Sequence, residues 1–138
     1  MERSNITLSR LDFQRITRCI EEEKKLRTIN DFEIQRLLYE LTRAEITEPR
    51  KIPNNIITMN SEVEISFLDS QKTVRLKIVY PDEANIKEGK ISIFSPIANA
   101  LLGHKEGDVI EWVVPAGGTK FKIEKIIYQP EAEGHYNL

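Results

Sequence analysis

The stretch SPIANALLGHKEGD, residues 95–108, decides how the second half of this 138-residue chain folds. Ser95 can accept a hydrogen bond from an amide of a first helical turn, and Pro96 suits the first helical position, where no amide donor is needed. Gly103 supplies the left-handed residue with which helices commonly end. A helix of about two turns is therefore expected here, because these start and stop signals stand so close together. The side chains expected to face inward are Ile97, Ala100 and Leu101.

Short segments with a period of two surround this helix and predict strands. The expected strands cover residues 63–67, 74–78, 91–94, 109–114 and 119–128. Asp69–Gln71 connects the first two strands, and Pro115–Gly118 forms the last turn. The alternation of the last strand slips near Lys125, as a β-bulge would make it do. We therefore predict an antiparallel sheet of four or five strands that wraps around one short helix.

The first 50 residues follow a helical period instead. One helix is expected from Ser9 to about Arg27, where Ser9 and Asp12 resemble a capping box, and a second starts at Asn30. Only about three residues separate them, so the helices should fold back as an antiparallel hairpin, with coiled-coil packing and arms of roughly 25 Å. The apolar stripes are Phe13, Ile16 and Ile20 in the first helix and Ile34, Leu37, Leu38, Leu41 and Ala44 in the second.

Two prolines separate these patterns within Glu48–Pro53, because each proline lacks an amide donor and biases its predecessor toward extended backbone. We place the boundary there. The predicted organisation is a helical hairpin over residues 1–50 and a β-rich domain over residues 54–138. The fold class is α+β.

The composition of the chain bears on its binding partners and its cellular compartment. The 20 Lys and Arg residues are balanced by 22 Asp and Glu residues, and both signs are mixed along the chain, so nucleic-acid binding of its own, sequence-specific binding included, is not expected. Cys19 stands alone, which is typical of a reducing compartment, and no apolar stretch is long enough for a signal peptide or a membrane span. We expect a cytoplasmic protein without a membrane partner.

The quoted stretch carries a resemblance. Together with Pro115–Gly118, residues 95–108 resemble the C-terminal, FKBP-like domain of the Gre transcript-cleavage factors in both order and spacing. Three further segments resemble the Rnk family, the regulators of nucleoside diphosphate kinase, so that this likeness covers residues 56–138. They are Thr58–Ser61, Val79–Pro81 and Tyr128–Ala132.

The resemblance implies a non-catalytic regulator that binds RNA polymerase near its secondary channel and competes with Gre factors there. It also implies that Ser95, Pro96 and Asn99 contact the polymerase. Gre proteins commonly carry an acidic residue before the Ser-Pro pair, whereas Phe94 stands here, so a charge-based contact is not carried over. Transcript cleavage is not expected, since Gre factors reach the polymerase magnesium with a much longer hairpin.

The predicted hairpin tip contains the polar residues Asn30, Asp31 and Glu33. Carboxylates suit magnesium, but acids are also favoured at the start of a helix by its dipole. Since Asn30 and Glu33 fit a capping box, we interpret them as a helix start and expect neither a metal site nor a cofactor.

Two alternatives stay open at this stage. The FKBP fold also serves prolyl isomerases and chaperone-like modules, although the aromatic residues here stand at alternating strand positions that favour core packing. A true Gre-type cleavage factor is the other alternative, and it would need the tip acids to reach the polymerase magnesium. A monomer is compatible with the sequence, because no heptad pattern requires a second copy.

Overall fold

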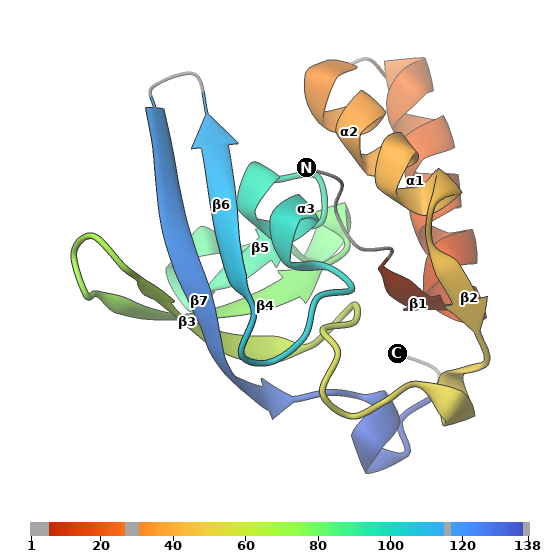
Figure 1. Cartoon of the computed structure of the whole chain (residues 1–138). Helices are drawn as coiled ribbons and strands as arrows, with labels where there is room; N and C mark the ends of the chain where they lie inside the picture. The colour runs from red at the N-terminus through yellow and green to blue at the C-terminus, as the bar shows by residue number, and fades with distance from the viewer. Residues whose placement is uncertain (1–5, 27–30, 115–116, 137–138) are drawn as a thin grey trace.

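The computed structural model describes residues 6–26, 31–114 and 117–136, and the side chains of residues 25–26, 31–33, 112–114 and 117–119 lie outside that description. Two helices in the N-terminal part are followed by a curled sheet, which confirms the α+β class (Figure 1). The N-terminal elements are β1 (Thr7–Ser9), α1 (Arg10–Leu26), α2 (Asp31–Thr42) and β2 (Glu45–Thr47).

The main sheet has five strands in the order β5-β4-β3-β7-β6. They are β3 (Glu62–Phe67), β4 (Thr73–Val79), β5 (Lys90–Ser92), β6 (Val109–Val114) and β7 (Gly117–Tyr128). The prediction of an antiparallel sheet is wrong at one edge, because β5 pairs with β4 in parallel. The physical reason is the connection between them. It runs through two 3-10 turns, η2 (Pro81–Glu83) and η3 (Ile86–Glu88), and brings the chain back in the same direction.

The slip predicted near Lys125 is confirmed as irregular pairing between β3 and β7. Glu62 pairs with Tyr128 and Val63 with Ile126, so residue 127 is skipped. Glu64 then pairs with Lys125 and Ile65 with Ile123, so residue 124 is skipped as well. Extra residues on one strand bend it and increase its twist. The long strand β7 can therefore curl the sheet around the short helix.

That short helix is α3 (Pro96–Leu101), and its sequence signals are confirmed. The Ser95 side chain accepts a hydrogen bond from the Ala98 amide, and Gly103 adopts a φ of 80° just beyond the helix end. The helix contacts both α2 and β6, so it lies between the sheet and the N-terminal helices (Figure 1).

The helices join the same hydrophobic core as the sheet. Ile16 and Ile20 of α1 and Leu37 of α2 belong to one buried cluster with residues of α3 and the sheet. Packing between α1 and α2 as a coiled coil stays a prediction, as do the two domain ranges and the FKBP-like description. A small parallel sheet that was not predicted pairs β1 with β2, so that α1 begins at Arg10 rather than Ser9. Three-residue strands are too short to show a period in the sequence.

Candidate functional site

The junction between α1 and the sheet is organised around Asp12, a fully buried carboxyl in the first turn of α1. The capping prediction was half right. Ser9 Oγ accepts a hydrogen bond from the Asp12 amide at 3.0 Å, but the Asp12 carboxyl turns toward the sheet instead of back to Ser9. Its two oxygens accept hydrogen bonds from the Met59 amide at 3.2 Å and from the Tyr80 hydroxyl at 3.4 Å. Asp12 thus links α1 to the loops that precede β3 and follow β4.

The loop before β3 continues this polar network. The Thr58 amide donates to Ser61 Oγ at 2.9 Å, which closes a tight turn in which Asn60 takes a positive φ of 67°. Thr58 Oγ1 donates to the carboxyl of Glu131 at 2.8 Å, and Glu131 itself is only 9% exposed. Glu131 lies in η4 (Glu131–Glu133), so the C-terminal segment reaches the same junction.

Gln129 fastens the C-terminal segment to the start of the second half of the chain. Its side-chain amide donates to the carbonyl oxygens of Pro53 at 2.8 Å and Ile56 at 2.6 Å. The segments Thr58–Ser61, Val79–Pro81 and Tyr128–Ala132, which stand apart in the sequence, therefore supply partners within one junction.

Burial gives the junction unusual electrostatics. Burial is the largest cause that raises the pKa of Asp12 to about 7, and the charge of Glu131 raises this pKa further. The Met59 amide, Arg15 and Tyr80 act in the opposite direction and lower it. Burial also raises the pKa of Glu131, while the bond from Thr58 lowers it. The pKa of the Tyr80 hydroxyl is raised far above its ordinary value by burial and by Asp12, so Tyr80 stays a hydrogen-bond donor.

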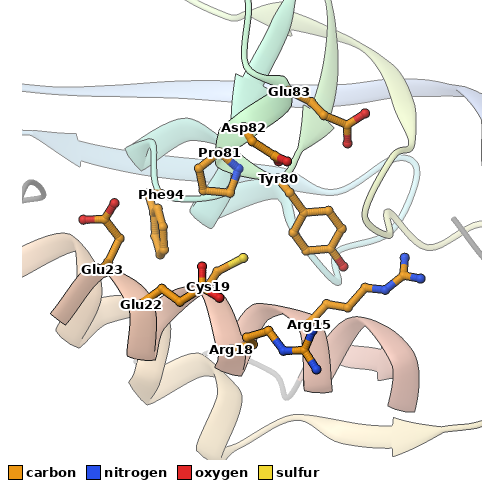
Figure 2. A pocket seen from close by; sticks show the side chains of 10 residues that line it. All are labelled: Arg15, Arg18, Cys19, Glu22, Glu23, Tyr80, Pro81, Asp82, Glu83 and Phe94. Carbon is orange, nitrogen blue, oxygen red and sulfur yellow. The ribbon is translucent and has the colours of Figure 1, made fainter. Parts of the chain in front are cut away.

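An open cleft of about 440 Å³ adjoins the junction (Figure 2). One wall is α1 and the other is the chain that follows β4, with Phe94 at one end. The lining side chains are Arg15, Arg18, Cys19, Glu22, Glu23, Tyr80, Pro81, Asp82, Glu83 and Phe94. Burial, followed by Glu22 and Asp82, raises the pKa of the Cys19 thiol, so the thiol stays protonated and is a poor nucleophile.

The predicted polymerase contacts lie around the start of α3. Ser95 and Pro96 are partly exposed, whereas Asn99 is only 2% exposed. Phe94, which stands before the Ser-Pro pair, is 4% exposed and belongs to the core cluster. Contact between this turn and RNA polymerase stays a prediction.

The hairpin tip is not tested by the structure. Asp31 begins α2, which also contains Glu33, but Asn30 and the side chains of both acids lie outside the described residues. Among the residues that are described, no group of three or more His, Cys, Asp or Glu side chains could hold a metal ion. No described helix is long and apolar enough to cross a membrane.

Sequence reasoning missed the role of Asp12, although a signal for it exists. Asp12, Ile16 and Ile20 follow one another at intervals of four residues, so the carboxyl lies on the buried stripe of α1. An acid at a stripe position needs a polar partner from elsewhere in the fold.

Comparison with known proteins agrees with this architecture. The family model for the GreA/GreB transcription elongation factor C-terminal domain matches residues 52–128. The regulator of nucleoside diphosphate kinase from Escherichia coli K12 is 34% identical along the full length of both chains. GreA from Orientia tsutsugamushi strain Boryong is 40% identical over 76% of this chain and 66% of its own.

A solved structure gives the same result for the fold. The prokaryotic transcription elongation factor GreA/GreB from Nitrosomonas europaea matches with a TM-score of 0.74 and 36% identity, over 89% of this chain and 99% of that one. The helices and the curled mixed sheet are thus those of a GreA-like fold. The chain belongs to the family of the regulator of nucleoside diphosphate kinase, and its residues 52–128 match the GreA/GreB C-terminal domain.

Proposed function

We propose that this protein is a cytoplasmic, non-catalytic transcription regulator that binds RNA polymerase near its secondary channel and competes there with Gre factors. The observation that carries the proposal is the combination of a GreA/GreB C-terminal domain with short helices. The domain provides a surface suited to the site where Gre factors act. The helices determine how far the bound protein extends.

Helix length argues against transcript cleavage. The 17 residues of α1 span about 25 Å and the 12 residues of α2 about 18 Å, at 1.5 Å per residue. Hydrolysis by a second magnesium ion requires carboxylates at the reacting phosphate. Helices of this length would leave Asp31 and Glu33 short of the polymerase active site, so the bound protein would occupy the entrance without acting on the transcript.

The contact surface of the proposal is the turn into α3. Ser95 and Pro96 are held there by hydrogen bonds from Ser95 Oγ to the Ser92 carbonyl at 2.8 Å and from the Ala98 amide to Ser95 Oγ at 3.4 Å. A surface held in place before binding loses little conformational entropy when a partner docks. The backbone amide of Asn99 donates to the Ser95 carbonyl at 3.0 Å and so closes the first turn of α3.

The first test is a pull-down of core RNA polymerase with the purified protein, with and without excess Gre factor. Binding that Gre factor displaces is expected. Pro96→Glu should weaken binding by placing a charge on the contact turn, while Ser66→Ala, on the solvent-facing side of β3, serves as the control. Failure of the wild-type protein to bind would overturn the proposal.

The second test measures transcript cleavage in backtracked complexes, and no stimulation is expected. Stimulated cleavage that Asp31→Asn and Glu33→Gln abolish would instead support a true Gre-type factor. A prolyl-isomerase assay addresses the remaining alternative. Packing of Phe67 edge-on against the buried Phe121, with ring centroids 6.0 Å apart, disfavours it, because these aromatic rings fill the core rather than line a pocket.

A further inference from the structure

We infer that Asp12 is a positioning residue that couples the helices to the sheet according to whether its carboxyl carries a proton. The geometry carries this inference. Asp12 is fully buried, belongs to α1, and accepts its two bonds from Met59 and Tyr80, which belong to the loops at the ends of β3 and β4. A change at this one carboxyl therefore acts on the attachment of the helix to the sheet.

The groups that face Asp12 determine the direction of the change. Arg15, on the same helix, favours the ionised carboxyl, as do the Met59 amide and Tyr80. Glu131, in η4, opposes it with a like charge, and burial opposes it further because a carboxylate loses its hydration. Burial and Glu131 prevail, since the pKa of Asp12 rises to about 7.

Arg15, the Met59 amide and Tyr80 offset only part of the cost of burying the Asp12 charge. Tyr80 lies beside Arg15 at the edge of the open cleft, as Figure 2 shows, so water can enter the junction from that side when its contacts loosen. Protonated Asp12 fits the closed junction, and ionised Asp12 favours a junction that opens to water. The attachment of α1 should therefore weaken as pH rises through about 7.

This device would regulate the proposed function, and to that extent it rests on it. The turn at Ser95 lies between β5 and α3, whereas Asp12 lies in α1. A polymerase that contacts the sheet domain would find the helices at the secondary channel held firmly at lower pH and loosely at higher pH.

The test uses nuclear magnetic resonance on the free, full-length protein. The Asp12 carboxyl carbon and the Met59 amide should titrate together with a midpoint near pH 7. Hydrogen-exchange protection factors in residues 10–20 and 57–61, corrected for the intrinsic effect of pH, should fall at least several-fold between pH 6 and 8. A midpoint near pH 4, or protection that does not change, would overturn the inference.

Three variants separate the coupling from a general effect of pH. Asp12→Asn keeps a neutral, hydrogen-bonding side chain and should remove both the Met59 titration and the change in protection. Glu131→Gln removes the facing charge and should lower the midpoint. Glu21→Gln, exposed on the same helix, is the matched control and should leave the midpoint unchanged.

Polymerase binding is measured separately at pH 6.5 and 8. Wild-type affinity should differ between the two, whereas the Asp12→Asn variant should bind equally well at both. Titration of Asp12 near pH 7 without any polymerase binding would overturn the proposed function and leave the coupling standing. Titration of Asp12 near pH 4 together with normal polymerase binding would overturn the coupling and leave the proposed function standing.

Discussion

The core around α3 and the junction at Asp12 hold the same molecule together by different means. Around α3, apolar residues such as Phe121, Ile123 and Leu101 are fully buried. At the junction, Asp12, Thr58 and Glu131 are buried together and depend on hydrogen bonds. Apolar packing is insensitive to pH, whereas buried carboxyls couple folding to protonation. The stability of the junction at Asp12, rather than that of the core around α3, is therefore expected to depend on pH.

The largest loss of stability is expected from truncating a large side chain in the apolar core. Phe121→Ala removes a fully buried ring and should lower the free energy of unfolding by about 3–5 kcal/mol, measured by urea denaturation. Phe121→Leu should cost less, because it keeps most of the volume. Leu68→Ala is the control, since Leu68 is 47% exposed, and a comparable loss there would contradict the central position of Phe121.

The next effect tests the place where the N-terminal segment touches the core. A Cβ at Gly103 would clash with Ile6 Cβ, and Gly103 has a φ of 80°. Gly103→Ala should therefore cost about 1–2 kcal/mol for the left-handed backbone and about 1–3 kcal/mol more for the steric clash. Thermal or urea denaturation measures the sum.

Gly107→Ala is the matched control for this prediction. Gly107 has a φ of 93°, but a Cβ there would meet nothing within 4 Å, so the substitution adds only backbone strain. Equal losses of stability in the two variants would show that Ile6 does not pack against the end of α3.

The pH dependence of stability distinguishes the two regions directly. Because the folded protein holds the Asp12 proton more tightly than the unfolded chain, unfolding free energy should fall as pH rises from about 4 to about 7, by at most ~1.4 kcal/mol per pH unit. Glu131 should contribute with the same sign. Urea denaturation across this range measures the slope.

The Asp12→Asn variant sharpens the same measurement. Its slope should be smaller, and the difference from wild type should level off above pH 7, where Asp12 is ionised in both states. Identical slopes for the two proteins would place the pH dependence elsewhere in the molecule.

The smallest effect concerns the cap of α1. Ser9→Ala removes the acceptor for the Asp12 amide and should cost about 1 kcal/mol, as loss of an N-cap usually does. Ser9→Asn should restore most of it. A loss well above this value would indicate that Ser9 also orients the Asp12 carboxyl.

Much of the sheet domain was predictable because its signals are local. Ser95, Pro96 and Gly103 bound α3 by their own backbone preferences, and the slip near Lys125 indicated the irregular pairing of β7. The parallel edge strand β5 was not predictable, since its direction depends on the course of the connecting chain. The pairing of β1 with β2 was equally hidden, because it joins segments that are far apart in the sequence.

The features that bear on function also fall into those that the sequence predicted and those that only the structure revealed. By itself the sequence determined the α+β class, the helix at Ser95, the short length of the N-terminal helices and the family resemblance, all of which depend on local pattern. Only the tertiary structure decided that Asp12 is buried beside Met59, Tyr80 and Glu131. The pKa of a carboxyl depends on which distant groups surround it and on how much water reaches it, and neither property can be read from neighbouring residues.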